Sequence, residues 1–413
     1  MNNAALVIGA GQAGVQVAST LRENGYDASI TLAGAESHPP YSRPPLSKEF
    51  LEEAIDPTRL ELRTDQFYND QRIDVRVDDP VVDVAFVEPA RPDGIATTAS
   101  GAEIPFDLLA FTTGARPRRL AIPGADLRGV LYLRVIDDAI ALRRELGSAE
   151  RVVVVGGGFI GLEAASVAKS AGKTVTIVEA LDRLAARAVA PVMSTFLYDA
   201  HTRRGVDVRL NTQVAAFEGA GRVATVRLAD GSAIAADLVI VGVGILPRYE
   251  LAERAGIECD GGILVDSAAR TSRPGVVAAG DCTVMPNPLT GAGRVRLEST
   301  QNATAQAKVA GLSLLGLPAA HDAVPWFWSD QYDLKIQIAG LSQKYDDFVV
   351  RGEPDSEHFS VVYYSNDRLL ATDAVNQMAD YLAVRTALGR ASTIDRVAAA
   401  DAAVPLKQLI RAI

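Results

Sequence analysis

One glycine pattern occurs twice in this chain. Residues 9–14 read Gly-Ala-Gly-Gln-Ala-Gly, and residues 156–161 read Gly-Gly-Gly-Phe-Ile-Gly. Each pattern follows a short apolar run, at 6–8 and at 152–155, and precedes a segment with helical periodicity. A single G-x-G-x-x-G is weak evidence, but a strand, a glycine turn and a helix in this order indicate a dinucleotide-binding βαβ unit. The sequence therefore predicts two bound dinucleotides.

The length and charge narrow the class of protein further. A chain of 413 residues exceeds the size of a single core, so two or three domains are expected. The formal net charge of −10 argues against a general nucleic-acid partner or an anionic membrane surface. No apolar stretch is long enough to span a bilayer, and residues 1–10 read as a first strand rather than a signal peptide. We expect a cytoplasmic protein.

The two cysteines, Cys259 and Cys282, lie far apart in the sequence and in no metal-binding or C-x-x-C spacing. We expect neither a disulfide framework nor a metal site, and we expect both thiols to be buried.

The two glycine patterns lie in units that are built alike. The first is predicted to have a strand at 6–8, a helix at 15–24 that stops at Gly25, and a strand at 29–33. The second repeats this order, with a strand at 152–155, a helix through Ser170 and a strand at 174–178.

Two later segments resemble each other and read as crossings between domains. Residues 106–117 form an apolar strand that ends in small residues, and residues 236–247 are a near-copy. Residues 271–281, a short apolar strand ending in Gly280-Asp281, suggest that the first domain resumes after an inserted one. Strands of an antiparallel sheet, followed by helical segments to Ile413, are predicted at 334–338, 347–350, 359–364 and 369–374.

These patterns predict an α/β fold with two Rossmann-like dinucleotide-binding domains and a C-terminal α+β domain containing an antiparallel sheet. The predicted first domain is discontinuous, at 1–116 and 247–322. The inserted domain spans 117–246, and the C-terminal domain spans 323–413.

The two units differ where the second strand ends. In the inserted unit, Glu179 can accept hydrogen bonds from both hydroxyls of an adenosine ribose and would repel a 2′-phosphate, which favours NADH over NADPH. Arg183 and Arg187 follow, with surface salt bridging or pyrophosphate contact as their expected roles. In the first unit Gly34 occupies the matching place, so the ribose contact must come from the backbone near Ala35 or from Glu36.

The ordered set of motifs resembles the two-dinucleotide-binding flavoprotein reductases over most of the chain. The set comprises the first glycine turn, Thr112-Thr113-Gly114, the second glycine turn with Glu179, Gly242-Val243-Gly244 and Gly280-Asp281. This resemblance implies FAD in the first domain and NADH in the inserted one. It also implies that Asp281 binds the ribityl chain or the pyrophosphate of FAD.

The segment after the first unit separates the branches of these reductases. Residues 38–48 contain no cysteine, which excludes a thiol relay at that face. Their ending, Arg43-Pro-Pro-Leu-Ser-Lys48, resembles the ferredoxin reductases of bacterial Rieske oxygenases and haem monooxygenases, the putidaredoxin reductase and biphenyl dioxygenase reductase group. Three further segments resemble the same group: Gly161-Leu162-Glu163, residues 325–331 (Pro-Trp-Phe-Trp-Ser-Asp-Gln) and residues 404–407 (Val-Pro-Leu-Lys).

This second resemblance implies roles for several side chains. Lys48 and Glu163 would pair beside the flavin N5, with an ordinary interdomain salt bridge as the alternative. Trp328, or less favourably Trp326, would cover the exposed flavin edge, and Phe159 and Ile160 would flank the nicotinamide. Residues expected to contact FAD are Gly9, Gly11, Ala13, Gly14, Ala35, Glu36, Arg43, Lys48, Val82, Thr113, Gly114, Arg134, Asp281, Thr300 (through its backbone) and Trp328. Residues expected to contact NADH are Gly156, Gly158, Phe159, Ile160, Gly161, Glu179, Arg187, Gly242 and Gly244.

The implied reaction moves a hydride from NADH to FAD and passes electrons singly to a [2Fe-2S] ferredoxin, which serves a Rieske dioxygenase or a haem monooxygenase of aromatic catabolism. Because such ferredoxins are usually acidic, docking needs a local basic patch, for which the candidates are Arg294, Arg296, Lys335 and Lys407. Rubredoxin reduction, oxygen reduction and a redox-sensing role like that of apoptosis-inducing factor remain alternatives. The sequence leaves a monomer and a homodimer open.

Overall fold

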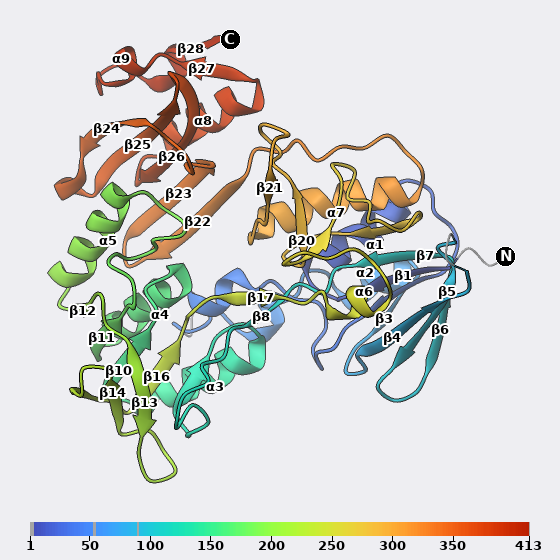
Figure 1. The fold of residues 1–413 in the computed structure, drawn as a ribbon, viewed down its shortest axis with the longest axis horizontal. Helices are drawn as coiled ribbons and strands as arrows, with labels where there is room; N and C mark the ends of the chain where they lie inside the picture. Colours follow the sequence, from blue (N-terminus) through green and yellow to red (C-terminus); the bar gives the residue numbers. More distant parts are fainter. Residues whose placement is uncertain (1–3, 53–54, 89–90, 413) are drawn as a thin grey trace. The chain divides into compact units, whose positions relative to one another are not determined.

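The computed structural model describes residues 4–52, 55–88 and 91–412, which form two compact units (Figure 1). The first unit comprises residues 1–42, 58–116 and 246–325, and the second comprises 43–57, 117–245 and 326–413.

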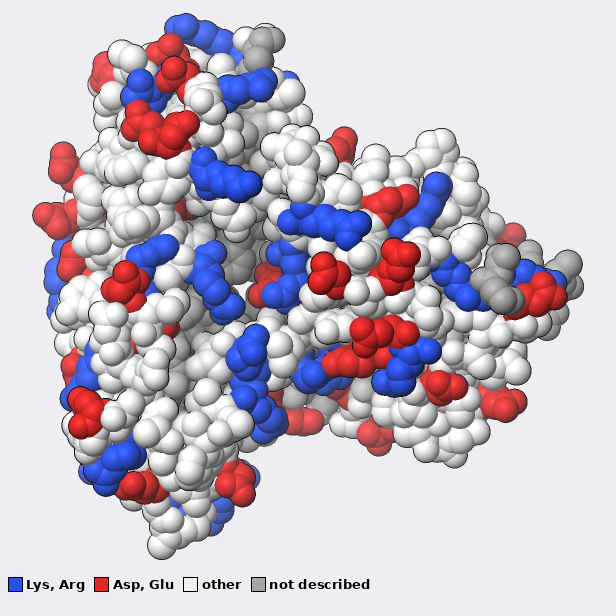
Figure 2. All heavy atoms as spheres, in the orientation of Figure 1, with Lys and Arg blue, Asp and Glu red and all other residues white. Residues whose placement is uncertain are grey.

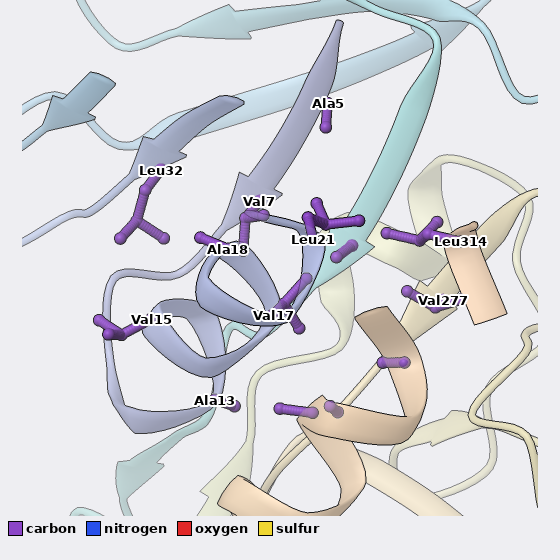
Figure 3. Close-up of a cluster of buried hydrophobic side chains, with 14 of the residues drawn as sticks. Ala5, Val7, Ala13, Val15, Val17, Ala18, Leu21, Leu32, Val277 and Leu314 are labelled. Carbon is purple, nitrogen blue, oxygen red and sulfur yellow. The ribbon is translucent and has the colours of Figure 1, made fainter. Parts of the chain in front are cut away.

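The first unit is built on a parallel sheet with the strand order β19-β7-β1-β2-β3. Its strands are β1 (Ala5–Ile8), β2 (Ile30–Ala33), β3 (Ile73–Arg76), β7 (Leu108–Phe111) and β19 (Val276–Ala278). The helices α1 (Gln12–Glu23) and α7 (Thr300–Leu314) supply apolar side chains to a core shared with this sheet (Figure 3). The last strand in the sheet comes from residues far along the chain, as the Gly280-Asp281 motif predicted.

The packing of α1 against α7 depends on small residues. A methyl group at Gly311 would lie 2.8 Å from the Cβ of Thr20, so only glycine allows the two helices to approach this closely. Val17 and Leu21 on α1 and Leu314 on α7 fill the buried contact (Figure 3).

The second unit repeats this architecture. Its parallel sheet has the order β12-β11-β10-β16-β9, from β9 (Val130–Tyr132), β10 (Arg151–Val155), β11 (Thr174–Val178), β12 (Asp207–Arg209) and β16 (Leu238–Val241). Its helices are α3 (Ile136–Ser148), α4 (Phe159–Ser170) and α5 (Pro191–Arg203). The predicted βαβ units are therefore confirmed in both places.

In each unit, a three-stranded antiparallel sheet is inserted in the chain before a strand of the parallel sheet, and the sequence did not predict it. In the first unit this sheet contains β4 (Val81–Phe86), β5 (Gly94–Thr98) and β6 (Glu103–Phe106). In the second unit it contains β13 (Val214–Glu218), β14 (Thr225–Leu228) and β15 (Ala233–Ala235). The repeat thus extends beyond the glycine motifs.

A five-stranded antiparallel sheet lies in the C-terminal part, with the order β22-β23-β26-β25-β24. Its strands are β22 (Trp326–Gln331), β23 (Leu334–Gly340), β24 (Asp347–Glu353), β25 (His358–Ser365) and β26 (Arg368–Val375), and α8 (Met378–Gly389) packs on it. The prediction of helices alone after this sheet was wrong. α9 (Arg396–Ala399) is short, and β27 (Ser392–Ile394) pairs with β28 (Ile410–Ala412).

Shorter elements complete the described chain. The strands β8 (Ala115–Pro117) and β17 (Ile245–Pro247) pair with each other where the chain passes between the units. The others are η1 (Pro44–Ser47), η2 (Pro57–Leu60), α2 (Asp65–Asp70), α6 (Glu250–Arg254), β18 (Ile263–Leu264), β20 (Thr283–Pro286), β21 (Arg294–Val295), η3 (Pro354–Ser356) and η4 (Leu406–Gln408).

No helix among the described residues has the length and apolar character needed to cross a membrane. Acidic and basic side chains are interspersed on the face drawn in Figure 2. Of the two free cysteines, Cys282 is buried as expected, but Cys259 is only partly buried, which corrects the prediction for that thiol.

Candidate functional site

The first glycine turn is fixed by close backbone contacts. Gly9 has a φ of +118°, and a methyl group there would lie 2.1 Å from the carbonyl oxygen of Thr112 at the end of β7. A methyl group at Gly14 would lie 1.9 Å from the oxygen of Gly9. Thr112 secures the turn because its hydroxyl donates to Gly9 O at 2.8 Å. Gly9 and Gly14 are therefore required by the fold itself.

Gly11 has a different environment. No described atom lies within 4 Å of a methyl group placed there. Gly11 is also the N-cap of α1 and makes no side-chain cap, so the first amides of the helix have no side-chain acceptor from the cap. Open space before the positive end of a helix is what a pyrophosphate requires. The turn is shaped for the phosphates of a dinucleotide.

A second strand end and a second helix meet the first turn. The Cβ position of Gly280, directly before Asp281, would be 3.3 Å from the Cβ of Ala13 and 3.7 Å from that of Ala303. Ala303 lies in the first turn of α7, which begins at Thr300. The structure thus brings Ala13 close to Gly280, the neighbour of Asp281, at the first turn of α7, which begins with Thr300.

Glu36 lies beyond β2 and accepts a hydrogen bond from the hydroxyl of Tyr41. A methyl group at Gly34 would lie 2.8 Å from the Cβ of Ala10, so this strand end has no space for the carboxylate found in the other unit. Glu36 is thereby the nearest acid along the chain, and Ala35 stands between it and Gly34. Val82 is largely exposed on β4, and its carbonyl accepts from Arg254 at 3.0 Å.

Thr113 and Gly114 lie at the exit of β7. The hydroxyl of Thr113 donates to the carbonyl of Arg248, and the carbonyl of Gly114 accepts from Arg248 N at 2.9 Å. Gly114 has a φ of +65°, which a residue with a side chain rarely adopts. The predicted crossing is thus anchored to the segment after β17.

The second glycine turn reproduces the first. Gly156 has a φ of +103°, and a methyl group there would lie 2.5 Å from the carbonyl oxygen of Gly242 at the end of β16. A methyl group at Gly161 would lie 2.2 Å from Gly156 O. At Gly158, the N-cap of α4, no described atom lies within 4 Å of such a methyl group. The unit therefore presents a second phosphate cradle.

Glu179 is held beside this second cradle. Its carboxylate accepts from Gly157 N at 2.6 Å and from Leu181 N at 2.8 Å. The guanidinium of Arg187 lies against Gly244, where a methyl group would be 2.8 Å from Nη2. Arg183 differs from its expected roles. It donates to the carbonyls of Ala186 and Val189 and to the Ser194 hydroxyl, and so holds its own loop.

The start of α4 packs on β22. Phe159 lies 4.9 Å from Phe327, between ring centroids, while Ile160 is 40% exposed and so accessible to a ligand. Trp326 and Trp328 lie on the opposite side of the strand with centroids 5.5 Å apart, as alternation along a strand predicted. Trp326 continues into the core against Tyr381, whereas no ring contact of Trp328 beyond Trp326 is found among the described residues.

A buried ion pair lies one helical turn further along α4. Lys48, directly after η1, places Nζ 2.8 Å from Glu163 Oε2, and both side chains are almost fully buried. Ser47 donates to the same carboxylate oxygen, and Ser329 of β22 donates to Oε1 at 2.7 Å. The predicted Lys48–Glu163 pair is thus present within the second unit.

Burial and hydrogen bonding shift the pKa of the Glu163 carboxyl in opposite directions. Burial raises the pKa of Glu163, while Lys48 and the two serine hydroxyls favour the ionised form. The sequence reading missed Ser47 and Ser329. Ser329 lies two residues from Phe327, and strand alternation could have placed both on the α4 side.

The other cations predicted near the cofactors have partners of their own. Arg43 donates to the backbone oxygen of Arg134 at 3.0 Å, which brings these two predicted residues together. In the candidate docking set, Lys335 pairs with Asp330 at 3.0 Å, and Arg296 pairs with Glu298 at 2.7 Å. Arg294 and Lys407 are exposed.

Comparison with known proteins gives the family. A family model described as pyridine nucleotide-disulphide oxidoreductase matches residues 4–307, and one described as reductase C-terminal matches residues 326–410. The chain belongs to the pyridine nucleotide-disulphide oxidoreductase family. This oxidoreductase is 43% identical over 411 residues to the 5,5′-dehydrodivanillate O-demethylase ferredoxin reductase subunit of Sphingobium sp., with 98% of each chain covered.

Two solved structures are also similar to this oxidoreductase. The ferredoxin reductase for the CYP199A2 system from Rhodopseudomonas palustris has a TM-score of 0.94 and 39% identity, with 98% of this chain and 99% of that chain covered. The covalent putidaredoxin reductase–putidaredoxin complex has a TM-score of 0.92 and 36% identity, with coverage of 99% and 98%. The resemblance to ferredoxin reductases is confirmed.

The cofactors of the family, FAD and NAD(P)H, fit the two cradles of this oxidoreductase, because Gly11 and Gly158 leave open space before uncapped helices. Thiol chemistry does not fit. Burial raises the pKa of Cys259 to about 11 and also raises the pKa of Cys282, so neither supplies a thiolate near neutral pH.

Proposed function

We propose that this protein takes a hydride from NADH into FAD and delivers single electrons to a [2Fe-2S] ferredoxin, which serves a Rieske dioxygenase or a haem monooxygenase. The observation that carries the proposal is the duplicated glycine cradle, because two dinucleotide sites in one reductase fit a flavin and a nicotinamide nucleotide. The names of the relatives support ferredoxin as the acceptor. The proposal retains the cytoplasmic location and the three domains, at 1–116 with 247–322, 117–246 and 323–413.

The first cradle would hold FAD. Gly9, Gly11 and Gly14 shape the turn for its pyrophosphate, Asp281 accepts from its ribityl chain or binds near the pyrophosphate, and Glu36 accepts from its ribose. The remaining proposed FAD contacts are Ala13, Ala35, Arg43, Val82, Thr113, Gly114, Arg134 and Thr300.

The second cradle would hold NADH. Glu179 is fixed by two backbone amides and still offers lone pairs to the ribose hydroxyls, while its charge opposes a 2′-phosphate. Phe159 and Ile160 at the start of α4 would contact the nicotinamide half, and Arg187, Gly242 and Gly244 would line the adjacent loop.

When bound, FAD takes two electrons as a hydride and releases them singly, which matches a two-electron donor to a one-electron acceptor. We assign Lys48 to the flavin N5, where its ammonium would stabilise the electron-rich ring. Glu163 holds that ammonium in place through the 2.8 Å ion pair. Trp328 would exclude water from the flavin edge at which the ferredoxin docks.

The test is an anaerobic titration of the purified protein with NADH, then with NADPH, followed by oxidised [2Fe-2S] ferredoxin, monitored by the visible spectrum. The proposal expects bleaching of a flavin spectrum by about one equivalent of NADH, slower bleaching by NADPH, and recovery on addition of ferredoxin. Recovery with rubredoxin or oxygen but not with ferredoxin would identify a different acceptor. Slow reduction by NADH together with dimerisation would instead favour the redox-sensing alternative, and light scattering of the same sample distinguishes a monomer from a homodimer.

A further inference from the structure

A line of hydrogen bonds extends from Glu163 through the interior of the second unit. Ser329 Oγ donates to Glu163 Oε1 at 2.7 Å, and Gln331 Nε2 donates to Ser329 Oγ at 3.0 Å. Gln331 Oε1 lies 2.9 Å from His201 Nε2, and the Tyr332 hydroxyl lies 3.1 Å from His201 Nδ1. Ser329, Gln331 and His201 are fully buried.

Three elements of the second unit place these groups. Ser329 and Gln331 are two residues apart on β22 and therefore face the same side of the strand. Glu163 faces them from α4, and His201 faces them from α5. The line therefore joins the helices α4 and α5 to the C-terminal sheet inside one compact unit.

The bonding capacity of each group fixes the direction of donation. An ionised Glu163 only accepts, so the Ser329 hydroxyl donates to it. The amide nitrogen of Gln331 donates to Ser329, which leaves the amide oxygen to accept from His201 Nε2–H. His201 Nδ1 then accepts from Tyr332. Every donor in the line points toward Glu163.

This assignment requires a neutral His201. Burial lowers the pKa of His201 to about 4, the positive charge of Arg204 acts in the same direction, and the bond to Gln331 opposes both. Arg204 is held by Glu357 at 2.7 and 2.8 Å and by Asp333 at 2.7 Å. A neutral imidazole has one donor and one acceptor, as the line needs.

The turn at Tyr332 is an independent sign of constraint. Tyr332 and Asp333 connect β22 to β23, and Tyr332 has a φ of +56°, a conformation that hairpin turns usually give to Gly, Asn or Asp. The ring is held between His201, at 5.2 Å between centroids, and the guanidinium of Arg204, at 4.8 Å. In this conformation the Tyr332 hydroxyl reaches Nδ1 of His201.

We propose that Tyr332, His201 and Gln331 are positioning residues that keep the carboxylate of Glu163 ionised and turned toward Lys48. Aligned donors polarise one another, so the last donor, Ser329, is a stronger partner for the carboxylate than an isolated serine would be. Burial alone would favour the neutral acid, which would no longer hold the ammonium of Lys48. The proposed catalytic consequence rests on the assignment of Lys48 to the flavin N5.

The experiment compares two substitutions of His201 in the full chain with FAD bound. His201→Leu removes both bonds, whereas His201→Gln keeps a donor toward Gln331 and an acceptor toward Tyr332. Thr372→Val is the matched control, because Thr372 is fully buried in the same sheet and its hydroxyl bonds only to the Val361 carbonyl among the described residues. The readout is the infrared band of the protonated Glu163 carboxyl, identified by its absence in Glu163→Gln, followed over the whole pH range in which the protein stays folded.

We expect the protonated fraction of Glu163 in His201→Leu to rise about threefold to tenfold at a given pH. His201→Gln and Thr372→Val should both titrate like the unsubstituted protein. The same titration in His201→Leu and the unsubstituted protein would overturn the proposal, as would equal shifts in His201→Leu and His201→Gln.

Tyr332→Phe guards against a folding defect in His201→Leu, since it removes only the hydroxyl at the far end of the line. It should raise the protonated fraction in the same direction by a smaller factor, and no change would contradict the proposal. The infrared titration does not depend on the reaction of the flavin. If Glu163 shifts as expected but Lys48→Met reduces FAD at the normal rate, the assignment of Lys48 fails while the donor line stands.

Discussion

Glu179 has a structural role in the second glycine turn and a proposed role in binding the nucleotide. Its carboxylate is positioned by the amides of Gly157 and Leu181, so it needs no rearrangement when a nucleotide arrives. In the proposed NADH site such preorganisation would lower the cost of binding, and the negative charge would disfavour a nucleotide with a 2′-phosphate.

Replacement of Glu179 by Ala should therefore change nucleotide preference. Loss of hydrogen bonds to a charged group is worth about 1.5–3 kcal/mol, so the KM for NADH should rise roughly tenfold or more. The KM for NADPH should change less, because repulsion of the 2′-phosphate is removed. Steady-state assays with both nucleotides test this, with Glu218→Ala, which removes an exposed carboxylate of the same unit, as the control. An unchanged ratio of the two KM values would exclude Glu179 from the ribose site.

The buried carboxyl of Asp373 should make the stability of the folded protein depend on pH. It is fully buried on β26, Tyr363 donates to Oδ2 at 2.6 Å, and Oδ1 has no partner among the described residues. Burial raises the pKa of Asp373 to about 7. The folded state therefore binds this proton more tightly than the unfolded chain, and stability falls as the pH rises from about 4 to about 7.

Asp373→Asn should flatten that dependence, because the amide stays neutral and its oxygen still accepts from Tyr363. At about pH 8 the variant should be more stable than the unsubstituted protein by roughly 2–4 kcal/mol, and this advantage should shrink as the pH falls and disappear near pH 4. Urea unfolding followed by circular dichroism across this range is the measurement. Parallel stability profiles for the two proteins would show that Asp373 is not the titrating group.

Within each glycine turn, some glycines are required by the fold and others by the proposed ligand. Gly156 touches the backbone of the neighbouring strand end, whereas Gly158 faces open space before α4. The spacing of the motif alone does not distinguish these roles, but the contacts do.

We therefore expect opposite behaviour from two alanine substitutions. Gly156→Ala should destabilise the unit by several kcal/mol, because the added methyl group collides with Gly242 O and the φ is unfavourable. Gly158→Ala should leave the melting temperature nearly unchanged but weaken NADH binding at least tenfold, since the methyl group would occupy the place of the pyrophosphate. Thermal melts and equilibrium titration separate the two effects. Normal NADH affinity in Gly158→Ala would rule out this turn as the phosphate site.

The difference between local signals and contacts between distant segments determines which features could be predicted from the sequence. Local signals predicted the strands and helices around Gly9 and Gly156, because apolar periodicity and glycine turns are encoded within about 30 residues. Strand alternation could have placed Ser329 beside Glu163, but the groups beyond Ser329 were not predictable in this way. His201 is a lone histidine on a helix, and Gln331 meets it only after two distant segments have packed. The antiparallel insertions β4–β6 and β13–β15 were missed because their strands are short and only partly apolar.

The net charge of the protein affects how an acidic ferredoxin can dock. A protein with a charge of −10 repels an acidic ferredoxin at long range, so docking depends on local cations. Lys335 lies on β23, which pairs with β22, the strand that carries Trp328. Lys407 lies in η4.

Charge reversal at Lys335 and Lys407 should raise the KM for ferredoxin about tenfold at low ionic strength, with a smaller effect as salt is added. Reversal of Lys169 and Lys173 is the matched control, since it makes the same change in net charge at the far end of α4 and beyond. Equal effects of the two double substitutions would attribute docking to net charge rather than to a local patch. Assays of ferredoxin reduction over a salt series provide the data.

The strand order also has a consequence for synthesis on the ribosome. The sheet of the second unit is encoded between β9 and β16, so all its strands have been translated by Val241. The sheet of the first unit begins earlier but still lacks β19, which is translated only with Val276–Ala278. During elongation the later-encoded nucleotide sheet can therefore close first, while β7 waits as an exposed edge. The nascent protein would thus complete the sheet proposed to bind the nicotinamide nucleotide before the sheet proposed to bind the flavin.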